Sequence, residues 1–281
     1  MSSLLFDQYE ERLRRKGASP HTLRAFSIAA KKLDQWLGAE GMTAETASME
    51  SLEDYFDSLD YAASTKGTHL RYIQAAYNYG VKRGTIRHNP AIDVVVPAPD
   101  PHEPRVISSH CLREIKSRIV LEKDWIFFHL LAYTGMRRSE IRGLKWDDGD
   151  SLASVLRLEQ QTIRVIGKGR KPRLVPVHPA LAEVLMEQPA KAGDFVVPSY
   201  GKNGVALDTI MEITKRLSPT YTPHDYRRTV ATSLRRNGVD SGVIDRIMGW
   251  APSSIRQRYY DNVADAELHR AVLQLYRDDP I

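Results

Sequence analysis

Cysteine is almost absent from this sequence, since Cys111 is the only one among 281 residues. A single cysteine excludes an internal disulfide and any zinc site built from several cysteines. No apolar run approaches the length of a membrane-spanning helix, and the N-terminus carries acidic residues where a secretion signal would be basic. Asp and Glu do not cluster at the spacing of metal ligands. These absences lead us to expect a cytoplasmic protein that uses no metal or other cofactor.

Positive charge is in modest excess, with a formal net charge of +5 and a sequence pI of about 9.2. Arginine and lysine are concentrated within residues 12–16, 168–173 and 227–236. One such cluster is usually a solvated face of a folded protein. Three of them favour a polyanionic partner such as DNA.

Residues 1–93 read as a domain of four helices. Apolar residues recur at helical spacing over 4–16, 20–37, 49–59 and 63–83. Ser19-Pro20 is a typical helix start, an N-cap followed by a proline at the first helical position. The pattern predicts a four-helix bundle. The fourth helix has a basic face that we expect to contact DNA through Lys66, Arg71, Lys82 and Arg83.

Four prolines fall within residues 94–106. Such a run continues neither a helix nor a central strand, so it predicts an extended, semi-stiff linker. The second domain then covers residues 107–281. Two domains joined in this way can close around a DNA duplex as a clamp.

The second domain reads as mainly helical with a small antiparallel β-sheet. We expect helices over 109–118, 125–134, 178–186, 223–236 and 241–248. Three segments alternate as strands do, namely 155–159, 162–166 and 173–177. The last two flank a turn whose glycines and proline suit a hairpin. The predicted fold class is therefore a helical domain followed by a mixed α/β domain.

The start of the helix at 223–236 carries the strongest chemical signal. Thr222 is a candidate N-cap, Pro223 opens the helix, and Asp225 stands three residues after the cap. His224 and Arg227 are three residues apart and share one face of the first turn. This turn also offers unpaired backbone N–H groups and the positive end of the helix dipole, which together suit a phosphate.

Further motifs lie on both sides of this turn. Upstream, the segment TGMRRSE includes Arg137 and Glu140, and the predicted hairpin turn GKGRK includes Lys168. Because an arginine beside an apolar segment needs a partner, we expect Glu140 to pair with Arg137. Downstream, a Gly-Trp pair ends at Trp250, and Tyr259 stands nine residues later, on a helix expected to start near residue 253.

These four motifs, in this order and spacing, resemble the tyrosine recombinase (phage integrase) family. The box His224-x-x-Arg227 alone would be a weak signal, but four motifs in the right order and spacing are a strong one. The resemblance spans nearly the whole chain. The resemblance implies a site-specific recombinase or integrase that cleaves and rejoins DNA through a 3′-phosphotyrosyl intermediate. It further implies action in a synaptic tetramer, through a Holliday junction, without metal or ATP.

The resemblance also implies a role for each site residue. Arg137 and Arg227 would bind the non-bridging oxygens of the scissile phosphate, and Trp250 would add an indole N–H donor. His224 would accept or relay the proton of the attacking tyrosine, and Lys168 would protonate the leaving 5′-oxygen. The basic neighbours of these residues are expected to contact DNA, namely Arg170, Lys171, Arg173 and Arg228.

The nucleophile stays a choice between two adjacent tyrosines. The spacing from Trp250 and the pair Arg258-Tyr259 favour Tyr259. The segment that follows Tyr260, Asp-Asn-Val, resembles a common ending in the family and favours Tyr260.

The segment 266–276 has an apolar face at helical spacing and predicts a docking helix. It would pack on its own domain or, as the resemblance implies, on a neighbouring subunit. The protein would be a monomer in solution and a homotetramer on DNA, where it would be associated with the nucleoid. The direction of recombination would come from the DNA sites or from an accessory protein.

Two other functions fit parts of this pattern. A type IB topoisomerase uses the same tyrosine chemistry, although the short chain and the proline-linked helical domain favour a recombinase. A DNA-binding regulator without activity would not need a competent residue at every catalytic position. The sequence names neither the target sites nor the biological task, whether phage integration, plasmid or transposon mobility, or chromosome dimer resolution.

Overall fold

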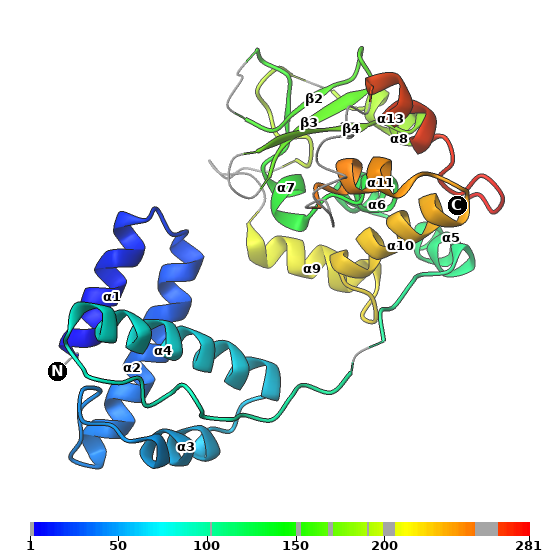
Figure 1. Ribbon diagram of the computed structural model, residues 1–281. Helices are drawn as coiled ribbons and strands as arrows, with labels where there is room; N and C mark the ends of the chain where they lie inside the picture. Colours follow the sequence, from blue (N-terminus) through cyan, green and yellow to red (C-terminus); the bar gives the residue numbers. More distant parts are fainter. Residues whose placement is uncertain are drawn as a thin grey trace. The chain divides into compact units, whose positions relative to one another are not determined.

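The computed structural model describes residues 3–101, 103–149, 153–167, 171–189, 191–198, 206–250 and 264–281. The chain divides into two compact units, Met1–His102 and Glu103–Ile281, which we call the N-terminal unit and the C-terminal unit (Figure 1). In the part of the chain described, no helix has the length and apolar character needed to cross a membrane.

The N-terminal unit contains the four predicted helices. They are α1 (Leu4–Arg15), α2 (Pro20–Ala39), α3 (Met49–Ser58) and α4 (Ala63–Arg83). Local capping sets the helix starts, since the side chains of Ser3, Ser19 and Ser48 each accept a hydrogen bond from the backbone N–H three residues on. The core between the helices is fully buried and includes Phe26, Leu33, Ile73 and Tyr77.

The proline-rich segment predicted as a linker crosses the boundary between the two units and forms no helix or strand in its described residues 94–101 and 103–106. Val94 still packs in the N-terminal core, and Ile107 is buried in the C-terminal core. Most residues between these two are exposed. The absence of regular structure in those residues follows from the prolines, which remove backbone donors and fix φ.

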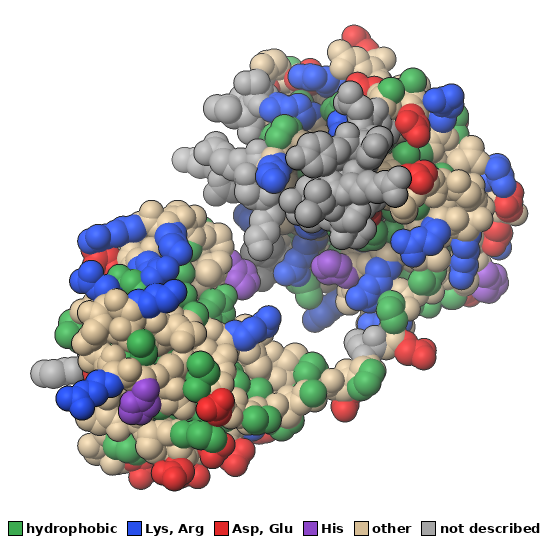
Figure 2. All heavy atoms as spheres, viewed as in Figure 1, with side chains coloured by type: hydrophobic (Ala, Val, Ile, Leu, Met, Phe, Trp, Pro, Cys, Tyr) green, Lys and Arg blue, Asp and Glu red, His purple; other side chains and the backbone are tan. Residues whose placement is uncertain are grey.

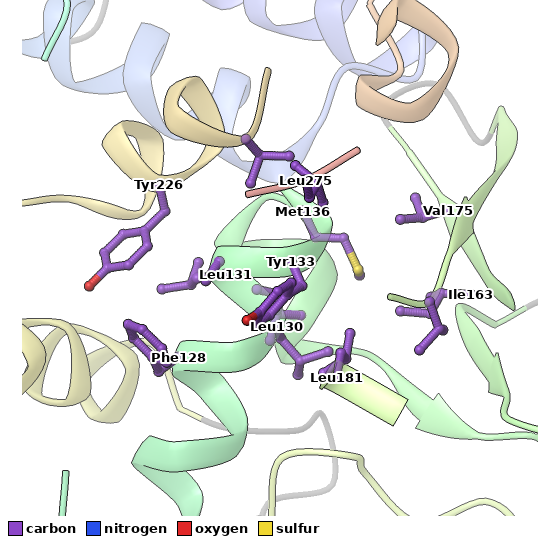
Figure 3. Close-up of a cluster of buried hydrophobic side chains, with 14 of the residues drawn as sticks. Phe128, Leu130, Leu131, Tyr133, Met136, Ile163, Val175, Leu181, Tyr226 and Leu275 are labelled. Atoms are coloured by element: carbon purple, nitrogen blue, oxygen red, sulfur yellow. The ribbon is translucent and has the colours of Figure 1, made fainter. Parts of the chain in front are cut away.

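The C-terminal unit is built around α6. Its helices are α5 (Ser109–Ser117), α6 (Glu122–Thr134), α7 (Arg138–Arg142), α8 (Pro179–Met186), α9 (Leu207–Leu217), α10 (Pro223–Arg236), α11 (Ser241–Met248) and α13 (Asp265–Val272). Figure 3 shows Phe128, Leu131 and Tyr133 of α6 in the core. Tyr226 of α10 lies on one side of them, and Ile163 and Val175 of the sheet lie on the other.

Within the described residues the sheet has four strands in the order β1-β2-β3-β4: β1 (Lys145–Trp146), β2 (Val155–Arg157), β3 (Thr162–Ile166) and β4 (Pro172–Pro176). The three predicted strands pair antiparallel as expected. The two-residue strand β1 adds a parallel pair with β2, so the sheet is mixed. Such a short strand is held by its neighbour and leaves no alternation in the sequence.

Helix α9 was missed by the sequence analysis although its signal is present. Ile210, Ile213 and Leu217 recur at the spacing of one helical face, and all three are buried in the structure. The helix start of α6 also differs, since it begins at Glu122 with no side-chain cap. Element ends are the least determined part of a periodic pattern.

The C-terminal segment docks on its own unit in the single chain. Leu268 and Val272 of α13 are buried in the same core as α6. The helix is shorter than expected, because the chain turns after Val272 and Tyr276 adopts a φ of 54°. The Tyr276 hydroxyl donates to the Ala132 carbonyl at 2.9 Å.

Candidate active site

The end of α6 places Arg137. Gly135 caps the helix in the left-handed conformation with a φ of 59°. A Cβ on Gly135 would lie 2.8 Å from Cε of Met248, the far end of a flexible side chain, so the left-handed φ is the stronger reason for glycine here. Arg137 follows in extended conformation and is the N-cap of the short helix α7.

Glu140 holds Arg137 as predicted, and it also holds Arg173. The carboxylate accepts hydrogen bonds from the Arg137 backbone N–H at 2.7 Å and from Arg137 Nη1 at 2.8 Å. Nη1 and Nη2 of Arg173, on β4, donate to the two oxygens of Glu140 at 2.8 and 2.7 Å. Burial alone would raise the pKa of Glu140, but hydrogen bonding and charge from Arg173, followed by hydrogen bonds from Arg137, lower it to about 2.

The capping box predicted at the start of α10 is present. Oδ2 of Asp225 accepts hydrogen bonds from the backbone N–H and the hydroxyl of Thr222, both at 2.8 Å. The first turn of α10 is thereby fixed in place. This turn carries both His224 and Arg227.

Arg227 is hydrogen-bonded to the ends of two other helices, α6 and α11. The residue is 3% exposed, and its Nη1 donates to the Gly135 carbonyl at 2.6 Å while its Nη2 donates to the Met248 carbonyl. Burial, together with the charges of Arg137 and Arg173, lowers the pKa of Arg227 to about 10. It stays protonated at neutral pH, and its positive charge is only partly balanced.

Trp250 lies beside this arginine. It follows Gly249, which ends α11 with a φ of 63°. Cζ of Arg227 lies 5.6 Å from the centroid of the indole ring, a distance at which a cation is attracted to the face of an aromatic ring. The side chain of Trp250 is exposed, so its N–H can be presented to a bound molecule.

His224 lies on the exposed side of the same helical turn. Burial, and then the positive charges of Arg227, Arg228 and Arg137, lower the pKa of His224 below its usual value. The imidazole is therefore neutral at pH 7 and can accept a proton. Around the single carboxylate of Glu140 lie three arginines, Arg137, Arg173 and Arg227. The site therefore has a net positive charge, which suits an anion with several oxygens such as a phosphodiester.

The structure brings together Arg137, Glu140, His224, Arg227 and Trp250 among the predicted site residues. Four further predicted residues, Lys168, Arg170, Tyr259 and the alternative nucleophile Tyr260, lie outside the described residues. Among the described residues, no group of three or more His, Cys, Asp or Glu side chains is arranged to hold a metal ion.

Arg173 has a different place from the one that the sequence analysis assigned to it. It was expected to contact DNA, but its side chain is only 8% exposed and its guanidinium is bonded to Glu140. Lys171 and Arg228 are exposed. The sequence around Arg173 does not indicate this contact, because Glu140 and Arg173 are 33 residues apart and meet only in the folded chain.

The remaining predicted DNA contacts lie on the N-terminal unit. Arg71, Lys82 and Arg83 are exposed on α4, and Arg71 also donates to the Gly67 carbonyl at 3.3 Å. Lys66 is half-buried and donates to the Phe56 carbonyl at 2.7 Å. Figure 2 shows lysine and arginine side chains gathered on this unit over the end of α1, and acidic side chains over α3.

Comparison with known proteins gives a consistent result. The model of the family described as "Phage integrase family" matches residues 105–266. Tyrosine recombinase XerD of Listeria monocytogenes serotype 4b (strain F2365) is 23% identical over 285 residues, which cover 92% of this chain and 94% of that protein. Tyrosine recombinase XerC of Mycobacterium tuberculosis (strain ATCC 25177 / H37Ra) is 27% identical over 298 residues, covering 95% and 96%.

Two solved structures share the fold. The integrase of transposon Tn1549, in complex with circular intermediate DNA, superposes with a TM-score of 0.65 at 18% identity, covering 96% of this chain and 99% of that one. A lambda integrase dimer bound to a COC′ core site gives a TM-score of 0.69 at 14% identity, covering 91% and 75%.

Proposed function

Since the chain belongs to the tyrosine recombinase (phage integrase) family, we propose that it cleaves and rejoins DNA at specific sites through a 3′-phosphotyrosyl intermediate. The bond energy of the cleaved strand is kept in the link to the protein, so a 5′-hydroxyl from a partner strand can reverse the step. Exchange of two strands and then of the other two would pass through a Holliday junction.

One observation carries this proposal: Arg137 and Arg227 are close enough to each other and to His224 for their charges to lower its pKa, and Trp250 lies against Arg227. A phosphodiester resists attack because its negative charge repels the nucleophile, and the transition state gathers further charge. Donors fixed in advance around that charge are the main catalytic contribution in such a reaction. The guanidinium groups of Arg137 and Arg227 are such donors, since each is positively charged and carries several N–H groups.

The proton transfers are assigned to His224 and Lys168. A tyrosine hydroxyl has a pKa near 10 in water, so it needs a base, and neutral His224 is suited to accept its proton. The leaving 5′-oxygen would be strongly basic, and Lys168 would protonate it. Tyr259 would be the nucleophile, by its spacing from Trp250.

The partners follow from this chemistry. We propose that two units joined by a linker hold one DNA duplex and that four subunits assemble on two sites. Within that tetramer the α13 segment would leave its own unit and pack on a neighbour, which would couple each tyrosine to the next subunit. An accessory protein or the sites themselves would set the direction, and action on DNA would keep the protein in the cytoplasm with the nucleoid.

The nucleophile gives the direct test. A DNA site is first selected by binding from a random pool, then nicked near the scissile phosphate so that the cut fragment diffuses away and the covalent complex is trapped. The wild-type protein is expected to give a protein–DNA band on a denaturing gel. Tyr259→Phe should bind the site with unchanged affinity and give no such band, because only the attacking oxygen is lost.

Tyr260→Phe is the matched control and should still trap DNA. If Tyr259→Phe traps DNA and Tyr260→Phe does not, the nucleophile is Tyr260 and the proposed function stands. If the wild-type protein binds its selected site and never becomes linked to it, the protein is a DNA-binding regulator and the proposed function is wrong.

A further inference from the structure

Arg173 is directed into the site and away from the surface. It lies on β4, its side chain is 8% exposed, and among the described residues it bonds to Glu140 and to the Ile247 carbonyl. Its Nε donates to the Ile247 carbonyl in the last turn of α11 at 2.9 Å. Its two terminal nitrogens form the bidentate pair with Glu140, the geometry in which an arginine holds a carboxylate most firmly.

Glu140 is saturated by these contacts. Oε1 accepts hydrogen bonds from Nη1 of Arg137 and Nη1 of Arg173. Oε2 accepts from the Arg137 backbone N–H and Nη2 of Arg173. A carboxylate has about four lone-pair positions, so all of them are used. Its side chain is only 4% exposed, which leaves little access for water.

The charges of the three groups decide what each can do. If Glu140 faced Arg137 alone, the two would form a neutral pair, and the carboxylate would compete with a phosphate for the guanidinium. With Arg173 present, the two arginines and Glu140 together carry one net positive charge. Arg137 is the more exposed of the two arginines, at 34% against 8%, so that charge is available on the Arg137 side.

We propose that Arg173 is a positioning residue that cancels the charge of Glu140, so that Glu140 orients Arg137 without weakening its hold on the phosphate. This rests on the proposed function, because it assumes that Arg137 binds the scissile phosphate. The same side chain fixes the end of α11 through Ile247, next to the Met248 carbonyl that binds Arg227. Arg173 thereby supports both arginines without touching DNA.

The test compares Arg173→Met, Glu140→Gln and the double variant in single-turnover cleavage of the nicked site, with every protein at saturating concentration. Methionine keeps the apolar bulk and removes the charge. Arg173→Met should bind DNA like the wild type and form the covalent complex at least about 100-fold more slowly, the size of effect seen when one transition-state donor is lost. The double variant should recover at least about tenfold of that loss, because a neutral amide in place of the carboxylate no longer competes for Arg137.

The recovery separates charge from shape. If Arg173 served only to hold the fold, removing Glu140 as well would loosen Arg137 further, and the double variant would be slower than Arg173→Met. That result would overturn the inference, and so would unchanged cleavage by Arg173→Met. A wild-type protein that forms no covalent complex would instead count against the proposed function.

Two further variants keep the test decisive. Arg216→Met is the matched control, because Nε and Nη2 of Arg216, on α9, also form a bidentate pair with a buried carboxylate, that of Asp124 on α6, at 2.7 Å to each oxygen. Its loss should affect the melting temperature and leave the cleavage rate at saturating concentration unchanged. If Arg173→Met does not fold, Arg173→Lys replaces it: lysine cannot form the bidentate pair but keeps the charge, so cleavage should stay within about tenfold of the wild type if the charge is what matters, and a folded but inactive lysine variant would overturn the charge argument.

Discussion

At the scale of the residue, His129 shows how burial controls protonation. It is 1% exposed inside α6, and its ring lies 4.4 Å from that of Trp125 and 5.9 Å from that of Tyr133, measured between centroids. Its Nδ1 lies 2.8 Å from the Trp125 carbonyl, so this nitrogen carries the proton and donates it. Burial lowers the pKa of His129 to about 4, and the carbonyl only partly opposes this effect.

Stability should therefore fall in mild acid. Between pH 6.5 and 4 the unfolded chain binds a proton at this histidine and the folded chain does not, so the free energy of unfolding decreases as the pH drops. Over this whole pH range the free energy of unfolding should fall by on the order of 3 kcal/mol. Urea denaturation at pH 7.5 and pH 5 measures the difference. His129→Gln should reduce it, whereas replacing the exposed His88 by Gln should not; an equal pH dependence in both variants would contradict this prediction.

At the scale of the element, helix ends build the site. The left-handed glycines at the ends of α6 and α11 turn the chain where a side chain would collide with a neighbour. A Cβ on Gly249 would lie 2.8 Å from Cδ of Arg173. Gly238, just after α10, also has a positive φ, of 78°, but has no atom within 4 Å of such a Cβ.

These two glycines give a matched pair of substitutions. Both Gly249→Ala and Gly238→Ala should lower the free energy of unfolding by about 1–2 kcal/mol, because alanine is strained in the left-handed conformation. Gly249→Ala should lose about 1–3 kcal/mol more from overpacking against Arg173, and its cleavage rate should fall because Arg173 is displaced from Glu140. Chemical denaturation and single-turnover cleavage measure the two effects. If both variants lose the same free energy of unfolding, Arg173 moves aside without an energetic penalty and the prediction is wrong.

At the scale of the whole molecule, two separate cores are connected by a proline-rich segment. If each unit binds part of one duplex, the linker raises the effective concentration of the second unit once the first is bound. DNA affinity should also fall steeply with salt, because lysine and arginine displace counterions from the phosphates.

Cutting the chain near Pro101 tests this arrangement. A mixture of the two separated units should bind the selected site at least about 100-fold more weakly than the intact protein, because the linkage is lost while every contact residue remains. Gel-shift titration measures the affinities. As a control, an uncut chain with glycine and serine in place of residues 97–101 should stay within about tenfold of the wild type. Equal affinity of the mixture and the intact chain would exclude joint binding.

The features that could be predicted from the amino-acid sequence are the local ones. The capping side chains of Ser19, Ser48 and Ser108 each accept a hydrogen bond from the backbone N–H three residues on, and the Asp225 carboxylate accepts one from the Thr222 N–H, so a short window contains the whole interaction. The Arg137–Glu140 pair and the shared face of His224 and Arg227 were predictable for the same reason. Family motifs added the roles of these residues, because order and spacing are properties of the sequence alone.

How these local features combine depends on contacts between residues that are far apart in the sequence. Arg227 meets the Gly135 carbonyl across 92 residues, and Arg173 meets Glu140 across 33, so no periodicity or short motif contains either contact. The second contact converts a basic residue that looked like a DNA contact into an internal partner of the carboxylate. Strand β1 likewise depends on its neighbour. The sequence gives the sign of a charged side chain but not its neighbours. The role of that side chain depends on the groups that folding brings within a few ångströms of it.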